Sequence, residues 1–177
     1  MAGAGGLRLT VTYRDAKPGD ADAIDGLFRA TFCGTFSQLY RREDLDAFLA
    51  QFNPAKWAMQ LSDPAYAFRL AEDEGEPVAY VRLGPMKLPL QIERPSILLE
   101  QLYVLPSYHG SGVARALMDW ALDEARRRGA EELYLTVFID NDRARRFYDR
   151  YSFEAVGKYD FMVGSQADED IIMRRTL

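Results

Sequence analysis

The alternation of apolar and polar positions divides the chain into strands and helices. Seven segments are either alternating or continuously apolar, which predicts β-strands, and they lie near residues 9–14, 66–71, 78–83, 97–105, 133–139, 154–163 and 170–175. The second and third of these are separated by the acidic turn EDEGEP, so we expect them to form a hairpin.

Apolar residues at helical spacing predict helices between these strands. Such segments lie near residues 20–33, 45–52, 54–61, 113–128 and 142–148. We expect Gly34 to interrupt the first helix, and Asn141 or Asp142 to cap the last. A strand, turn, helix and strand follow one another from residue 97 to residue 139, which predicts two parallel strands with a right-handed crossover.

Length and composition indicate one globular α/β domain over residues 1–177. The chain is 48% hydrophobic and 28% charged, which argues against a disordered or fibrous protein. We expect residues 1–7, which are rich in glycine and alanine, to be disordered. No apolar stretch approaches the roughly 20 residues of a membrane span, so no membrane partner is expected.

Charge and cysteine content narrow the class of partner. The net charge is −5, which argues weakly against nucleic acid. With one cysteine, Cys33, no internal disulfide can form, and this fits a cytoplasmic protein. We expect Cys33 to be a buried small residue rather than a catalytic thiol. With a single histidine, His109, no metal site of the His/Cys type is expected.

The turn after the fourth strand is a candidate anion site. Gly110 and Gly112 allow positive φ and a close backbone approach to a ligand at the start of a helix. The turn lacks the Gly-Lys-Ser/Thr ending of a nucleotide P-loop and the Gly-x-Gly-x-x-Gly pattern of a dinucleotide fold. An ordinary strand-to-helix turn with convenient glycines explains it equally well.

The segment from Asn141 to Phe153 is the second candidate. Asn141 suits a helix cap. Phe147 and Tyr151 share a helical face and are expected in the core. The Tyr148 phenol is able to deliver a proton, although a tyrosine at the edge of the core is an equally good interpretation.

Together the two segments resemble the GNAT superfamily of N-acetyltransferases. The phosphate-binding pattern Gln/Arg-x-x-Gly-x-Gly/Ala matches residues 109–114, with His109 in place of Gln/Arg. The pattern Asn-x-x-Ala-x-x-Phe-Tyr-x-x-x-Gly-Phe matches residues 141–153, with Ser152 in place of glycine. More finely, residues 31–49 and 159–173 resemble bacterial spermidine/spermine N-acetyltransferases.

The resemblance implies a fold and a cofactor. The expected fold is a mixed, mostly antiparallel twisted sheet flanked by helices, with two parallel central strands, Ile97–Val104 and Leu133–Phe138, that splay apart. Acetyl-CoA would enter that gap, while the helices of residues 20–62 would form the acceptor side. The residues implied in cofactor binding are Leu102, Tyr103 and Val104 through their backbone, the amides of His109, Gly110, Ser111, Gly112, Val113 and Ala114, and the side chain of Asn141.

The resemblance also implies direct attack of a neutral amine on the thioester. Glu100 is the candidate general base, because burial in an apolar strand favours a carboxyl that can take a proton. The alternatives are that Glu100 pairs with an Arg or Lys, or faces solvent. Tyr148 would return a proton to the departing thiolate, and an amide near Val104 would stabilise the oxyanion.

The acceptor is expected to be a small primary amine such as a polyamine. Phe32, Phe36 and Tyr40 either line its pocket or belong to the core. The acidic residues Asp160 and 168–170 either attract a polyamine or form a solvated hairpin tip. Residues 126–128, all arginine, either meet the adenosine phosphate or end a helix in solvent.

Other functions remain open from the sequence. A non-catalytic CoA-binding regulator has the same fold, and an N-terminal or lysine acetyltransferase of proteins has the same chemistry. A different phosphate-ligand enzyme on an α/β scaffold is the third alternative. A homodimer is also possible on this scaffold.

Overall fold

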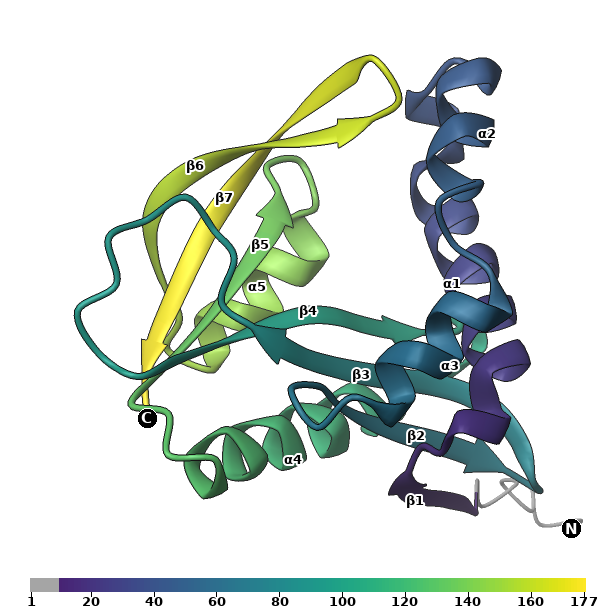
Figure 1. The fold of residues 1–177 in the computed structure, drawn as a ribbon, viewed down its shortest axis with the longest axis horizontal. Coiled ribbons are helices and arrows are strands. Elements are labelled where there is room, and N and C mark those ends of the chain that lie inside the picture. Colours follow the sequence, from purple (N-terminus) through teal and green to yellow (C-terminus); the bar gives the residue numbers. More distant parts are fainter. Residues whose placement is uncertain (1–9) are drawn as a thin grey trace, which may run out of the picture.

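The computed structural model describes residues 10–177, so the expectation for residues 1–7 lies outside the described residues. Its centre is one seven-stranded sheet with strand order β1-β2-β3-β4-β5-β7-β6 (Figure 1). The strands are β1 (Val11–Asp15), β2 (Ala67–Asp73), β3 (Glu76–Pro85), β4 (Ser96–Val104), β5 (Glu132–Phe138), β6 (Glu154–Val163) and β7 (Gln166–Thr176). The predicted strands are therefore all present, and β2 and β3 form the expected hairpin.

Five helices surround the sheet, and they are α1 (Ala21–Phe36), α2 (Arg42–Leu49), α3 (Pro54–Ser62), α4 (Val113–Arg127) and α5 (Asp142–Arg150). The expected interruption at Gly34 is wrong, because α1 continues through this residue to Phe36. A helical glycine costs only about 1 kcal/mol, and the buried face of α1, which includes Ile24 and Phe28, holds the helix in place.

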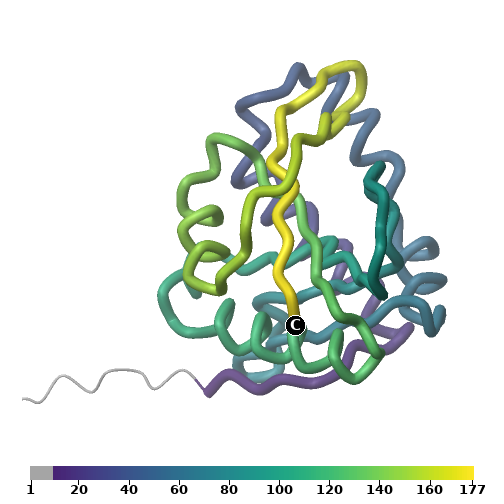
Figure 2. The backbone as a smooth tube through the Cα atoms, turned by 90° about the vertical axis from the view of Figure 1, so that its left-hand side faces the viewer, coloured from purple at the N-terminus to yellow at the C-terminus, as the bar shows by residue number. Residues whose placement is uncertain are grey.

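The sheet separates two main cores. In β2, Ala71 faces a core built on α4, whereas Leu70 faces a core built on α1, α2 and α3. Helices therefore cover both faces (Figure 1). A third, smaller cluster joins the loop 86–95 to β7 through Leu88 and Ile172. Figure 2 shows this loop and α5 on opposite sides of the C-terminal strand.

The sheet opens between its two parallel strands. β4 and β5 pair only over 96–98 and 132–134, and we call these three residue pairs the seam. Beyond the seam, β4 continues beside β3 to Val104, and β5 continues beside β7 to Phe138. Figure 1 shows the two strands diverging from this point. The mixed, mostly antiparallel sheet with two splayed parallel strands is thus confirmed.

A β-bulge lies where the gap opens. In the register of β3 with β4, Arg82 pairs with Gln101 and Leu83 pairs with Leu99, so Glu100 is the extra residue. A bulge of this kind bends the strand and redirects the side chain of the extra residue. The bulge therefore determines the surroundings of Glu100.

Candidate active site

The gap between β4 and β5 contains a cavity of about 880 Å³. Residues of β4, β5, α1, α5, β6 and β7 line it, together with the turn that precedes α4. This volume lies within the range of small-molecule sites, roughly 300–1,000 Å³. Most of the predicted site residues line the cavity, namely Glu100, Leu102, Tyr103, Val104, His109, Gly110, Ser111, Gly112, Ala114, Asn141 and Tyr148. Val113 is buried at the start of α4.

Backbone amides at the start of α4 form one end of the cavity. Gly110 and Gly112 adopt φ of 77° and 92°, the left-handed region in which glycine is favoured. The amides of His109 and Ser111 already donate to carbonyls of the turn. Within residues 10–177, the amides of Gly110, Gly112 and the next two residues have no backbone acceptor. These free amides and the helix dipole make an anion site.

His109 fixes the turn to the end of β4. Its Nε2 lies 3.0 Å from the Val104 carbonyl oxygen, and its Nδ1 makes a short contact with Nη1 of Arg143. The imidazole thus replaces the expected Gln/Arg by joining the turn to β4 and to α5. Arg143 places an exposed cation beside the anion site. Sequence reasoning missed it, because only the fold brings the first turn of α5 to this place.

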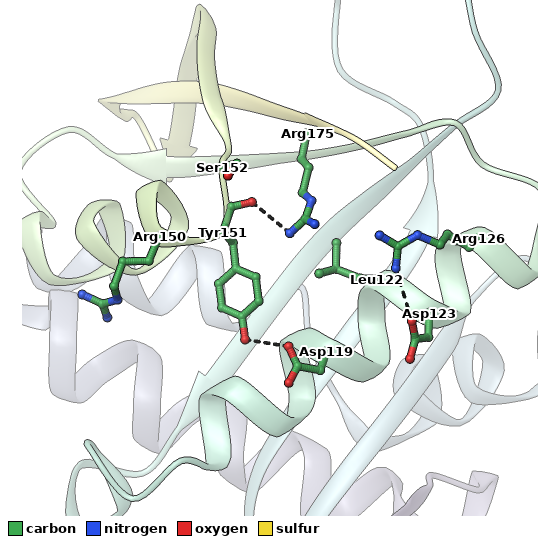
Figure 3. Close-up of a pocket in the computed structure, with 8 residues that line it drawn as sticks. All are labelled: Asp119, Leu122, Asp123, Arg126, Arg150, Tyr151, Ser152 and Arg175. Atoms are coloured by element: carbon green, nitrogen blue, oxygen red, sulfur yellow. Dashed lines mark hydrogen bonds and ion pairs between the residues drawn. The ribbon is translucent and has the colours of Figure 1, made fainter.

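Hydrogen bonds at both ends of α5 hold the helix beside the cavity. At its start, Asn141 Oδ1 accepts from the Ala144 amide at 3.2 Å, which confirms the cap and leaves the amide NH₂ for a ligand. At its end, the Tyr151 hydroxyl donates to Asp119 at 2.8 Å, and Arg175 donates to the Tyr151 carbonyl at 2.9 Å (Figure 3). Ser152 follows with φ of 60°, the conformation that favours the glycine of the family pattern.

Tyr148 is more deeply buried than its aromatic neighbours on α5. Its side chain packs edge-on against Phe147 and Phe153 and lines the cavity. Phe147 and Tyr151, which were expected in the core, are half-buried at its border. Burial raises the pKa of Tyr148 to about 12, so the phenol stays protonated at neutral pH. In the described part of the chain its hydroxyl makes no hydrogen bond, and it is free to donate to a ligand.

Glu100 lies between two cations. Its carboxylate forms a short ion pair with Arg82 and a 2.6 Å ion pair with Lys87, and its side chain is 3% exposed. A Cβ on Gly84 would lie 2.6 Å from Glu100 Oε1, so this glycine makes room for the carboxylate. The structure thus shows the paired arrangement that the sequence left open. Its role as general base stays a prediction.

Two buried carboxylates lie on the other side of the cavity. Asp168 and Asp170 are 8% and 6% exposed and line the cavity from β7. Glu169, between them, points the other way and pairs with Lys158, and Asp160 is exposed. The interpretation as a solvated hairpin tip therefore holds for Asp160 and Glu169 but not for Asp168 and Asp170. The strand begins at Gln166 rather than at the expected Asp170. In a strand of that length, side chains two positions apart share a face, so the sequence pattern would have placed Asp168 and Asp170 on the same side.

The two carboxylates have different partners. Asp168 accepts a short hydrogen bond from the hydroxyl of Tyr40. Asp170 has Thr136 of β5 as its partner, and this hydrogen-bonding interaction favours the ionised carboxylate. Burial raises the pKa of Asp170 to about 6, with a further contribution from the charge of Asp168, although the Thr136 hydrogen bond opposes the shift. Asp170 therefore titrates near neutral pH.

Aromatic side chains form the wall beside these carboxylates. The cavity-lining rings are those of Phe32, Phe36, Tyr40, Phe138 and Phe161. Phe32 is 2% exposed and also belongs to the core, so both interpretations of this residue hold. Cys33 is half-buried and does not line the cavity. The arginines 126–128 do not line it either, and they pair with Asp123 and Glu124 at the end of α4.

The sequence of this chain is similar to those of known proteins. The profile of the acetyltransferase (GNAT) family matches residues 28–153, which is more than half of the chain. The chain belongs to the GNAT family. It is 33% identical to an uncharacterized N-acetyltransferase of Mycobacterium tuberculosis, over 89% of this chain and 98% of that protein. It is 30% identical to the streptothricin acetyltransferase of Streptomyces lavendulae, over 84% of each chain.

Solved structures give the same fold. The PaiA N-acetyltransferase of Thermoplasma acidophilum, in complex with coenzyme A, superposes with a TM-score of 0.77 at 17% identity, over 96% of this chain and 100% of that chain. The protein is thus a GNAT acyltransferase of class EC 2.3.1, and acetyl-CoA is its co-substrate.

The residues present fit this co-substrate. Free amides at the start of α4 suit a pyrophosphate, and the gap beyond the seam exposes the backbone of β4 to an extended chain. Residues 10–177 hold no group of three His, Cys, Asp or Glu side chains suited to a metal ion. No helix in the same range is long and apolar enough to cross a membrane.

Proposed function

We propose that this GNAT enzyme acetylates a small primary amine, and that a polyamine is the first class to test. The observation that carries the proposal is the position of Asp168 and Asp170 in a cavity that also contains the anion site. A buried carboxylate pair attracts an ammonium group, and the aromatic wall suits a carbon chain. The related streptothricin acetyltransferase is named for a small-molecule acceptor, which supports this class.

The cofactor side of the proposal uses the residues predicted from the sequence. The amides of residues 109–114 would hold the pyrophosphate, with the free amides after Ser111 contributing most. The backbone of 102–104 and the NH₂ group of Asn141 would hold the pantetheine arm. An amide near Val104 would stabilise the oxyanion at the thioester carbonyl.

Tyr148 is the proposed proton donor to the departing sulfur. Its side chain lines the cavity beside α5, and its raised pKa keeps the phenol protonated at neutral pH. A free thiolate is a weaker base than the Tyr148 phenolate, so the transfer has to be coupled to cleavage of the C–S bond and to the return of a proton to the phenolate. Tyr148 therefore acts as a general acid.

The acceptor class is tested by release of thiol from acetyl-CoA with a panel of amines. The panel contains spermidine, spermine, short diamines, amino acids and peptides with free N-termini or lysines. Multiple turnovers are required, because Cys33 gives a stoichiometric background. Sustained release with polyamines or diamines is the expected result. Turnover with peptides alone would assign a protein acetyltransferase, whereas acetyl-CoA binding without any turnover would favour a regulator.

Two further predictions concern the assembly and the compartment. A homodimer remains a prediction, which sedimentation of the purified chain tests directly. The cytoplasmic placement rests on the single cysteine and is tested by fractionation of the native host.

A further inference from the structure

We propose that Asp170 is the catalytic residue that accepts the proton of the acceptor ammonium group. The inference rests on the proposed function, because it assigns a base to amine acetylation. Asp170 lines the cavity from β7, opposite the free edge of β4, and is 6% exposed. Glu100 has no such freedom, because it is held between Arg82 and Lys87.

Asp170 shares the cavity with the proposed proton donor. Tyr103 of β4 also lines it, and burial raises the pKa of Tyr103, with smaller contributions from Tyr148 and Asp170. All three residues line the same cavity. An amine bound in this cavity would therefore share it with both the Asp170 carboxylate and the Tyr148 phenol.

The groups that face Asp170 all favour a cationic ligand. Among residues 10–177, the charged or titratable groups placed toward it from neighbouring elements are acidic or phenolic, and they are Asp168 of β7, Tyr40 after α1, Tyr103 of β4 and Tyr159 of β6. Thr136 of β5 contributes a neutral hydroxyl donor. Asp168 already accepts a short hydrogen bond from the Tyr40 hydroxyl, so we assign the proton to Asp170.

Protons and bonds balance in the proposed step. Asp170 accepts one proton from the ammonium group, which leaves a nitrogen lone pair to form the C–N bond with the thioester carbonyl carbon. The C–S bond breaks with its electron pair on sulfur. Tyr148 gives its proton to that sulfur and regains one, through water, from the newly acylated nitrogen. Asp170 then releases its proton to solvent, which is the net proton of the reaction.

The test is the pH profile of turnover in Asp170→Asn. The wild-type rate should rise through an acid limb near pH 6, the pKa of Asp170. The variant should lose that limb and at least about 100-fold in kcat at neutral pH, the usual contribution of a general base. Its residual rate should keep rising with pH, since only amine deprotonated in solution can attack. An amine that is uncharged at the assay pH should restore most of the lost rate.

Matched variants separate this role from a structural one. Asp160→Asn removes the same charge from the exposed face of the neighbouring strand and should leave the profile unchanged. Thr136→Val removes the hydrogen bond that lowers the pKa of Asp170, so the acid limb should move to higher pH. This variant carries the test if Asp170→Asn is insoluble, and an unmoved limb would then overturn the proposal.

The outcomes distinguish the two proposals. If the wild type turns over no amine, the proposed acceptor class fails. If the wild type is active and Asp170→Asn keeps the acid limb, Asp170 is not the base. Loss of the limb in Glu100→Gln, with Asp170→Asn unaffected, would assign the base to Glu100 instead.

Discussion

The hydroxyl of Tyr40 donates a hydrogen bond to the carboxylate of Asp168, although 128 positions separate the two residues. The contact joins the helical layer of residues 21–62 to the C-terminal hairpin. It lies at the cavity wall, where it links two distant segments of the chain and holds the Asp168 carboxylate in place. The same pair therefore contributes to stability and to the acceptor site.

Tyr40→Phe should lower stability and weaken acceptor binding together. A hydrogen bond to a charged group contributes about 1.5–3 kcal/mol, so the free energy of unfolding should fall by about that amount in urea titrations. The KM for the amine should rise while the affinity for acetyl-CoA stays the same. An unchanged KM would mean that Asp168 lies outside the acceptor site.

Tyr148→Phe should lower kcat while leaving the Kd of acetyl-CoA largely unchanged. The expected loss is about 100-fold, the lower range for a positioned general acid. Because burial raises the pKa of Tyr148 to about 12, the wild type should show no loss of activity through this group up to mildly alkaline pH. Calorimetry and single-turnover kinetics measure the two quantities separately. Full turnover under conditions in which chemistry limits the rate would exclude this role.

Gly112→Ala should weaken acetyl-CoA binding at the anion site. The residue has φ of 92°, and a side chain in the left-handed region costs about 1–2 kcal/mol. If relief of that strain moves the amides, Kd should rise about tenfold, which corresponds to about 1.4 kcal/mol. Gly75→Ala is the matched control, because Gly75 has φ of 85° in the β2–β3 turn. Both variants should lose stability, and only Gly112→Ala should lose affinity.

Glu100→Gln should destabilise the fold whatever its effect on catalysis. Arg82 is 8% exposed, and removing one partner of a buried ion pair costs about 3–5 kcal/mol. Glu131→Gln removes one partner of an exposed pair with Arg94 and should cost less than about 1 kcal/mol. Chemical denaturation of both variants measures the difference. Equal losses of unfolding free energy in the two variants would show that the buried Glu100 ion pairs stabilise the fold no more than an exposed pair does.

Asp170 should also make stability depend on pH. Its folded pKa of about 6 lies above the ordinary aspartate value of 3.8, so the native state holds the proton more tightly than the unfolded state. The associated stability is present below about pH 4 and is lost as pH rises to about 6. Asp170→Asn should therefore gain up to about 3 kcal/mol relative to the wild type between pH 4 and pH 7. If the unfolding free energies of the wild type and the variant changed with pH in parallel across this range, the raised pKa of Asp170 would be contradicted.

The local geometry of the proposed cofactor side was predictable from sequence, whereas the surroundings of the proposed acceptor side were not. The left-handed φ of Gly110 and Gly112 and the helix cap at Asn141 each belong to a single turn or helix start, so their spacing alone carried the signal. The surroundings of Glu100 depend on a bulge and on Arg82 of another strand. No local pattern encodes such a register shift.

The same distinction explains Asp168 and Asp170. Their burial depends on where β7 begins and on Tyr40, which only the folded chain places beside them. The helix through Gly34 has a similar origin, because long-range packing of Phe28 and Phe32 outweighs a weak local propensity.

The seam has a mechanical consequence. Backbone pairing joins the two halves of the sheet through three residue pairs at one end of the cavity, so we expect those pairs to act as a hinge between two arms, β4 and β5. A small rotation at the hinge is amplified at the far ends, where the anion site and α5 lie. Pro95 and Leu177 bond the backbone of residues 131 and 132 beside this hinge. Substitutions there, far from any ligand, should alter how widely the arms open.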